Sequence, residues 1–370
     1  MLKRKIINDP VYDGFLSIDD PVILQVIEHP YFQRQRRIKQ LGLTYLVYPG
    51  AMHTRFSHML GALNLMNRAL DVLKLKGVEI TDEECRGAKL AILLHDLGHG
   101  PFSHTSERVL VDVPHEEITL LMMQRINEEM DGALNVAIDI FTNHYHKHFL
   151  HQLVSSQLDM DRLDYLGRDS FFTGVSEGIV GTDRIISMLN VHDDELVIDE
   201  KGIYSVEKFI ISRRLMYWQV YMHKTVIAAD QLLLGILRRA RDLDVSPFTF
   251  HLSPFDLDRF AEVDDDDVMV AVKHWQHSDD EILSTLCRNL VNRRLPAIRF
   301  SNEPFEGVEC DYFHGTGELH NRSYDFNDQE IKVLYKDGRC LPISEASDQL
   351  DRHFLEKQVT KYYHYFPKES

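Results

Sequence analysis

A stripe of apolar residues at helical spacing runs through residues 53–75 and constrains the fold more than any other feature of the chain. Its positions recur every three or four residues, so they share one face of an amphipathic helix. That face carries Phe56, Met59, Leu60, Leu63, Met66, Leu70 and Leu73. Similar patterns at about 116–130, 133–149, 151–166 and 205–242 supply further helices to cover it. We therefore predict a mainly α fold with a helical bundle core.

Local signals predict where some elements begin and end. Thr81 and Glu84 form a T-x-x-E capping box that starts a second helix, and the glycines and proline of 98–101 should end it. Residues 195–198 and 203–206 are expected to form one β-hairpin, and residues 331–335 and 340–343 another. The chain from about 295 onward is mixed. We expect a core of residues 1–250, which includes the N-terminal segment, and a small α+β region of residues 251–370.

Composition excludes several classes of protein. The formal net charge of −17 disfavours nucleic acid as a partner, because such a surface repels a phosphate backbone. No window reaches the roughly 18 uninterrupted apolar residues of a membrane helix, and the N-terminus lacks the apolar region of a signal peptide. We expect a soluble, cytoplasmic protein with no membrane partner. The four cysteines stand alone, which argues against a disulfide framework or a zinc ribbon.

Histidines and carboxylates cluster in the segment LLHDLGHGPFSH, residues 93–104. His95 is followed by Asp96, and His99 lies four residues after His95, so the two imidazoles are expected to share one helix face. His58 on the preceding helix and Asp161 on a later one could complete a site in the bundle core. A lone His-Asp dipeptide is a weak signal, but this combination predicts a divalent metal: Mn, Mg, Fe or Zn.

Several motifs together resemble one enzyme family. They are FQRQRRIKQLG (32–42), YPGAMHTRFSHMLG (48–61), LLHDLGHGPFSH (93–104), PHEE (114–117), DMDRLDYLGRD (159–169) and YMHK (221–224). In this order they resemble the HD-domain deoxynucleoside triphosphate triphosphohydrolases, which include bacterial dGTPases and the mammalian dNTPase that restricts retroviruses. One departure is Gln35, where these proteins usually have an apolar residue; we expect little functional consequence. The resemblance implies an HD-domain helical bundle.

The resemblance also implies roles for the clustered residues. His58, His95, Asp96 and Asp161 would bind the metal. His99, His104 and His115 would be catalytic, with His104 as the general acid, because imidazole titrates near neutral pH. His99 and His115 would contact phosphates or orient the attacking water, and Glu116 would fix the tautomer of His115.

A nucleotide-binding pocket is implied by the same resemblance. Arginine suits phosphate because its planar group donates two parallel hydrogen bonds. The phosphate-contacting candidates are Arg55, Arg162, Tyr165 and Arg213, and the sugar candidates are Gln40, Leu41, Tyr165 and Asp169. Arg213, Tyr217, Tyr221 and Lys224 recur at helical spacing, a pattern that alone is more often a solvated face. Tyr221, in the motif YMHK, is also among the substrate-binding candidates. Tyr165 would crowd C2′ and select deoxyribose.

A second, regulatory nucleotide site is implied where N-terminal segments of relatives meet across subunits. The matching positions are Lys5, Ile6, Glu28, Gln33, Arg36, His223 and Lys224. An activating nucleotide there would favour a homo-oligomer, with a tetramer expected.

The function predicted from the sequence is metal-dependent hydrolysis of dNTPs to deoxynucleoside and inorganic triphosphate, with dGTP as the expected substrate. One alternative is an HD phosphohydrolase that acts on a cyclic nucleotide, a nucleoside monophosphate or an alarmone. Another is a nucleotide-sensing regulatory protein without turnover, against which the intact histidines argue. A nuclease is disfavoured by the acidic charge.

Overall fold

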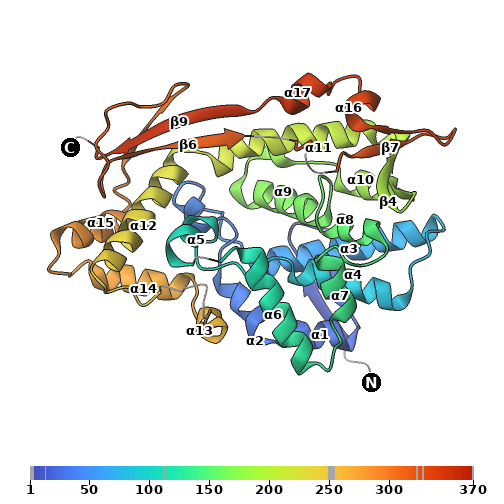
Figure 1. The fold of residues 1–370 in the computed structure, drawn as a ribbon, viewed down its shortest axis with the longest axis horizontal. Coiled ribbons are helices and arrows are strands. Elements are labelled where there is room, and N and C mark those ends of the chain that lie inside the picture. The colour runs from blue at the N-terminus through green and yellow to red at the C-terminus, as the bar shows by residue number, and fades with distance from the viewer. Residues whose placement is uncertain are drawn as a thin grey trace.

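A central helix, α3 (Arg55–Leu75), organises the fold (Figure 1). This computed structural model describes residues 4–12, 14–111, 113–248, 255–321, 324–326 and 329–368. All seven residues of the predicted apolar stripe are buried in α3, so that prediction is confirmed. Ala62, Leu65 and Ala69 are buried as well. Helix α3 is therefore enclosed on more than one face, and it packs against α4 (Asp82–Leu94) and α9 (Met160–Thr173).

The capping box at the start of α4 is confirmed. Thr81 Oγ1 accepts from the Glu84 backbone N at 3.2 Å, and Glu84 Oε2 accepts from the Thr81 backbone N at 2.8 Å. The helix ends at Leu94, so His95 to His99 form a tight turn instead of a helical face. The expectation that His95 and His99 share a helix face is wrong. Leu97 donates to the Leu94 carbonyl and His99 to the Asp96 carbonyl, three residues back in each case.

The longer helical patterns are interrupted. The pattern at 133–149 divides into α7 (Asn135–Phe141) and α8 (His148–Val154), and the pattern at 151–166 divides between α8 and α9. The pattern at 205–242 gives α11 (Ile203–Met216), a π-helical turn (Tyr217–Tyr221) and α12 (Lys224–Asp242). The two arms are bent by 55° relative to each other. Arg213 and Lys224 therefore do not lie on one straight face.

The other helices surround this core or extend it (Figure 1). They are α1 (Pro21–Glu28), α2 (Pro30–Arg34), α5 (His104–Leu110), α6 (His115–Glu129), α10 (Thr182–Met188), α13 (Leu257–Glu262), α14 (Asp265–Trp275), α15 (Glu281–Val291), α16 (Ile343–Ala346) and α17 (Arg352–Glu356). Within the described ranges, no single helix has both the length and the apolar composition of a membrane span. Residues 200–221 and 224–242 meet that criterion only as a bent pair.

The described residues also form three small sheets. Strands β1 (Lys5–Asn8) and β2 (Phe15–Ile18) form an antiparallel hairpin. Four strands have the order β3 (Leu189–His192), β4 (Glu195–Asp199), β7 (Lys332–Leu334) and β8 (Cys340–Pro342). A third sheet places β9 (Val359–Phe366) between β5 (Ala297–Ser301) and β6 (Gly315–Asn321). The mainly α fold with a small β part is confirmed.

One predicted hairpin is confirmed and the other is wrong. Strands β7 and β8 pair antiparallel, as expected for 331–335 and 340–343. Strand β4 pairs instead with β3, and residues 203–206 form the first turn of α11, where Val206 is buried in the core. Strand β4 also pairs in parallel with β7, so residues on both sides of position 250 share a sheet. The division at 250 stays a prediction.

Candidate metal centre and nucleotide pocket

The four predicted metal ligands come together from three places in the bundle. His58 lies on the first turn of α3, His95 and Asp96 in the turn after α4, and Asp161 on the first turn of α9. One ligand atom from each of His58, His95 and Asp161 lies within 4.8 Å of the others. Asp161 Oδ1 is 3.1 Å from His58 Nε2 and 3.3 Å from His95 Nε2. Asp96 joins them, with Oδ1 3.5 Å from His95 Nε2 and Oδ2 3.6 Å from His58 Nε2.

The hydrogen bonds of the two imidazoles fit a metal. His95 Nδ1 lies 2.7 Å from the Ile92 carbonyl oxygen, which can only accept, so Nδ1 carries the proton. His58 Nδ1 lies 2.7 Å from Asp164 Oδ2. Both Nε2 atoms are buried, and neither makes a hydrogen bond within the described part of the chain. Two imidazole nitrogens and two carboxylates that face one point are a donor set for a divalent cation.

The charges of the residues in this cluster strongly affect one another's pKa values. Burial opposes protonation of His58, but the carboxylates of Asp161 and Asp164 outweigh it and raise the pKa of His58 to about 10. Burial also works against ionisation of Asp96, yet Arg55, His95 and His99 hold its pKa well below the ordinary value. Without a cation the cluster therefore holds protons on imidazole beside ionised carboxylates. A divalent cation would replace those protons.

Helix α2 and the start of α6 hold the turn that carries His95 and Asp96. The Gln35 side chain, which is wholly buried, donates to the Leu97 carbonyl at 3.0 Å, and Arg34 Nη1 donates to the His99 carbonyl at 3.0 Å. A Cβ atom at Gly98 would lie 2.1 Å from the His115 carbonyl oxygen, so only glycine allows this approach of the turn to α6. The polar residue at position 35 thus supports the turn that carries His95 and Asp96.

A second group of side chains adjoins the metal ligands. The rings of His99 and His115 stack with centroids 3.9 Å apart. Glu107 Oε1 lies 2.8 Å from His99 Nδ1 and 3.5 Å from His115 Nδ1, and Glu116 Oε1 lies 3.3 Å from His115 Nε2. Burial and Arg55 lower the pKa of His99 to about 4. Burial has the same effect on His115, but Glu107 outweighs it and raises that pKa. The side chain of His104, the predicted general acid, lies outside the described residues.

The turn before α5 has a backbone that L-residues rarely adopt. Phe102 and Ser103 have φ values of 55° and 47°, and such conformations persist only where surrounding contacts enforce them. Phe102 N donates to Asp265 Oδ1 at 2.7 Å, and Ser103 Oγ accepts from Arg55 Nε at 2.9 Å. These contacts fix the start of α5 beside the predicted metal ligands.

A pocket of about 370 Å³ opens onto both groups. Its lining includes Gln40, Leu41, Arg55, Asp96, His99, His115, Asp161, Arg162, Tyr165, Asp169, Tyr217 and Tyr221. Seven of the eight predicted substrate residues therefore line one cavity. The eighth, Arg213, places its guanidinium 5.9 Å from the centre of the Tyr217 ring.

Hydrogen bonds organise the part of the pocket that Asp169, Tyr221 and Tyr165 line. Asp169 accepts from the Tyr221 hydroxyl at 2.7 Å, and its other oxygen lies 2.7 Å from His53 Nε2. The Tyr221 ring meets the Tyr165 ring edge to face, with centroids 6.3 Å apart. Arg55 forms an ion pair with Asp96. The aromatic and acidic side chains thus have fixed positions, and Arg55 is held against Asp96 of the predicted metal cluster.

The predicted regulatory residues form two exposed pairs and a helix start. Lys5 Nζ lies 3.9 Å from Glu28 Oε1, and the side chain of neighbouring Ile6 is exposed. Arg36 Nε donates to Gln33 Oε1 at 2.9 Å, and its guanidinium stacks on Phe56. His223 caps α12, and Lys224 is the first residue of that helix. Their joint role in a nucleotide site between subunits stays a prediction.

Comparison with known proteins identifies the family. Residues 55–169 match the HD domain, and residues 180–302 match the HD associated region. A phosphohydrolase of known crystal structure from Bacteroides thetaiotaomicron is 46% identical and superposes with a TM-score of 0.94 over 99% of this chain and 100% of the other. The chain belongs to the HD-domain phosphohydrolase family.

Other relatives are more distant. The Bacillus subtilis protein YwfO is 33% identical over 99% of this chain and 93% of its own length. The Dictyostelium discoideum homolog of the deoxynucleoside triphosphate triphosphohydrolase SAMHD1 is 32% identical over 60% of this chain. Human SAMHD1 is 29% identical over 64% of this chain. The matches cover 46% and 45% of those two enzymes, so this HD-domain chain spans less than half of their length.

Three residues of the HD-domain site were not found from the sequence. Asp164 and Glu107 hydrogen bond to histidines of the two clusters, and His53 pairs with Asp169. Asp164 had a detectable signal, because it lies three residues after Asp161 on the same helix and shares its face. The contact between His53 and Asp169 joins residues 116 positions apart, and no local sequence pattern predicts it.

Proposed function

We propose that this HD-domain protein hydrolyses deoxynucleoside triphosphates to deoxynucleoside and inorganic triphosphate, with dGTP as the expected substrate. One observation carries the proposal: a single pocket is lined by Asp96 and Asp161 of the His/Asp cluster and by arginine, tyrosine and aspartate side chains. The His/Asp cluster suits phosphate hydrolysis, and the arginine, tyrosine and aspartate side chains suit a phosphorylated sugar. The named activity of the Dictyostelium and human relatives supports the same substrate class.

His58, His95, Asp96 and Asp161 would hold the cation, which is Mn, Mg, Fe or Zn. A divalent cation in such a site supplies Lewis acidity and lowers the pKa of a bound water. Asp164 and the Ile92 carbonyl each hold the Nδ1 atom of one ligand histidine, so both Nε2 atoms face the cluster. These contacts set the ligand geometry before the cation arrives.

The histidines beside the predicted metal ligands would donate a proton to the leaving oxygen and bind the negatively charged phosphates. Water attacks the α-phosphorus, the bond from phosphorus to O5′ breaks, and the leaving oxygen needs a proton. His104 at the start of α5 is our general acid. His115, whose pKa is raised, would bind phosphate as a cation, whereas His99, whose pKa is about 4, would accept a hydrogen bond as the neutral ring. Glu107 would keep both rings in position, together with Glu116 for His115.

Arginines and the aromatic wall would select the substrate. The protein has a formal net charge of −17, so a triphosphate needs a local source of positive charge. Arg55, Arg162 and Arg213 would supply it. Asp169 and Gln40 would bind the 3′-hydroxyl, supported by Tyr221 and Leu41. Tyr165 would lie against C2′ and exclude a ribose hydroxyl.

Regulation by a second nucleotide is part of the proposal. Lys5, Ile6, Glu28, Gln33 and Arg36 would form one side of a site between subunits, and His223 and Lys224 of another subunit the other side. A ligand that bridges chains favours the assembled state, because it binds the oligomer and not the separated chains. We expect a homotetramer whose turnover depends on occupancy of this site.

The test is incubation of the purified protein with each dNTP and NTP, and with a cyclic nucleotide, a nucleoside monophosphate and an alarmone, with Mn²⁺ or Mg²⁺, followed by identification of the products. Asp96→Asn is the matched control, because it keeps the shape of the side chain and removes its charge. We expect deoxynucleoside and triphosphate from dNTPs with the native protein and no products with the variant. Turnover only of a cyclic nucleotide, a monophosphate or an alarmone, or binding without turnover, contradicts the proposal.

A further inference from the structure

The carboxylate of Asp164 is the meeting point of three side chains. It is wholly buried on α9. Its Oδ2 atom lies 2.7 Å from His58 Nδ1 and accepts from Arg168 Nε at 2.8 Å. Its Oδ1 atom accepts from the Tyr12 hydroxyl at 2.8 Å and from Arg168 Nη2 at 3.0 Å. The orientation of the carboxylate toward His58 is therefore set by Tyr12 and Arg168.

Tyr12 and Arg168 connect Asp164 to the N-terminal segment between β1 and β2. Tyr12 belongs to that segment, and Asp9 binds Arg168 through two contacts, 2.6 Å from Nη2 to Oδ2 and 3.2 Å from Nη1 to Oδ1. The Arg168 guanidinium is wholly buried, so it needs both carboxylates. A segment more than 40 residues before His58 in sequence thus contacts the residue that orients His58.

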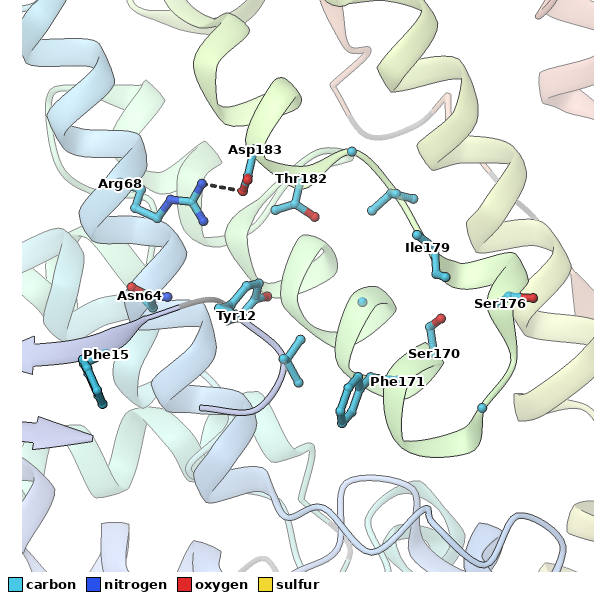
Figure 2. A pocket seen from close by; sticks show the side chains of 15 residues that line it. Tyr12, Phe15, Asn64, Arg68, Ser170, Phe171, Ser176, Ile179, Thr182 and Asp183 are labelled. Carbon is cyan, nitrogen blue, oxygen red and sulfur yellow. Dashed lines mark hydrogen bonds and ion pairs between the residues drawn. The ribbon is translucent and has the colours of Figure 1, made fainter. Parts of the chain in front are cut away.

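The Tyr12 hydroxyl is suited to be a permanent donor. Loss of solvation and the nearby Asp164 carboxylate raise the pKa of Tyr12 well above the ordinary value for a phenol, so the proton stays on oxygen. Figure 2 shows the Tyr12 ring between α3 and α9, in the wall of a pocket of about 690 Å³ that Asn64, Arg68 and Phe171 also line. The chain of contacts from the metal cluster therefore ends at a side chain that borders an open cavity.

We propose that Tyr12 is a positioning residue of the metal centre and acts through Asp164 on His58. Carboxylates that bind the second nitrogen of a ligand histidine fix its tautomer and ring orientation, and their loss weakens metal binding by about 10–100-fold. Tyr12 acts one contact further out, so its effect is smaller. The inference rests on the proposed metal site, and the experiment separates the two by measuring metal binding directly.

The experiment compares Tyr12→Phe with Tyr31→Phe. Each substitution removes one hydroxyl that donates to an aspartate. The Tyr31 hydroxyl donates to Asp258 Oδ1 at a distance of 3.1 Å, and neither residue contacts a predicted metal ligand. The dissociation constant for Mn²⁺ is measured by calorimetry, and the melting temperature is measured with EDTA and with Mn²⁺. We expect Tyr12→Phe to raise the dissociation constant by about threefold to tenfold and to reduce the Mn²⁺-dependent rise in melting temperature. Tyr31→Phe should change neither the dissociation constant for Mn²⁺ nor the Mn²⁺-dependent rise in melting temperature, even if it lowers the melting temperature measured in EDTA.

Action through Asp164 is tested by repeating Tyr12→Phe in an Asp164→Asn background, where its effect should fall below about twofold. If Tyr12→Phe does not fold, Asp9→Asn tests the same segment through Arg168, with the same expected loss. Unchanged Mn²⁺ affinity in the folded variant, or an undiminished effect in the double variant, overturns the inference. A native protein that binds no divalent cation overturns the proposed function itself.

Discussion

His58 and Asp164 join α3 to α9 through a contact of 2.7 Å between Nδ1 and Oδ2, and both side chains are wholly buried. The same contact directs His58 Nε2 toward Asp161, which lies one helical turn before Asp164. This pair therefore takes part both in the packing of the two helices and in the geometry of the predicted metal cluster. A substitution that separates α3 from α9 at this point should weaken metal binding and stability together.

Gly61 on α3 offers such a substitution. A Cβ atom there would lie 2.0 Å from Asp164 Oδ1 and 2.1 Å from Arg168 Nη2. Gly61→Ala should therefore reduce the free energy of unfolding by about 1–3 kcal/mol, because the buried pair must move. It should also weaken Mn²⁺ binding. Denaturant unfolding and calorimetry measure the two effects.

Gly167 on α9 is the matched control, because a Cβ atom there meets no other atom within 4 Å. Alanine is favoured over glycine within a helix, so Gly167→Ala should raise the free energy of unfolding by about 0.5–1 kcal/mol. Its Mn²⁺ affinity should equal that of the native protein. Equal effects of the two substitutions would show that close packing at Gly61 is not what holds Asp164.

Metal binding should depend on pH in a defined direction. The pKa of His58 is about 10 in the absence of a cation, because the carboxylates of Asp161 and Asp164 outweigh the effect of burial. His58 is therefore protonated near neutral pH, and a cation must displace that proton from Nε2. Affinity should rise with pH by about tenfold per unit for each proton released, until the pH reaches the pKa.

Calorimetry in two buffers with different heats of ionisation measures the number of protons released on binding Mn²⁺. We expect at least one near pH 7. The His58 protonation that competes with the metal is complete well below the pKa and is lost as the pH rises through it. Release of no protons, with a dissociation constant that is equal at about pH 6.5 and about pH 8.5, would contradict the charge state that we describe.

Sequence reasoning succeeded where structure is set by local contacts. The apolar stripe from Phe56 to Leu73 and the capping box of Thr81 and Glu84 depend on residues close in sequence. Helix α4 begins where the capping box places it, and α3 ends at Leu75 as predicted but begins at Arg55 instead of at residue 53. It failed where short patterns fit two structures. Residues 203–206 have the composition of a strand, but Val206 packs into the core as part of α11. The true partner of β4 is the short strand β3.

Within the site, the residue types could be predicted but their orientation could not. The motifs indicated that His58, His95 and Asp161 lie close together, and the structure places them in one cluster. The turn from His95 to His99 and the role of Gln35 depend on contacts between distant helices, which no local pattern encodes. The contacts of Tyr12 and Arg168 with Asp164 are of the same kind.

Tyr165 should control the choice between deoxyribose and ribose. A 2′-hydroxyl pressed against its ring would lose water without gaining a partner, which costs about 1–3 kcal/mol. In Tyr165→Ala, the ratio of kcat/KM for dGTP to that for GTP should fall by about tenfold. Tyr217→Ala, in the same pocket, is the control and should leave this ratio unchanged. A ratio that is unaffected by Tyr165→Ala would place sugar selection elsewhere, with Gln40 the next candidate.

Arg36 should be needed for activation and not for metal binding. It contacts Gln33 and Phe56 at the surface, outside the catalytic pocket. Arg36→Ala should abolish stimulation by a second nucleotide and leave metal content unchanged, whereas Arg86→Ala, at another exposed arginine, should leave both unchanged. Hyperbolic kinetics for every dNTP and every pair, from a protein that is monomeric by light scattering, would refute nucleotide-driven assembly and leave the catalytic proposal intact.

Identification of the bond that is broken tests the central claim most directly. Hydrolysis of dGTP in oxygen-18 water, followed by mass spectrometry of the products, locates the oxygen that water supplies. Attack at the α-phosphorus predicts label in inorganic triphosphate and unlabelled deoxyguanosine. Label in orthophosphate, with a nucleoside diphosphate left behind, would contradict the proposed triphosphohydrolase.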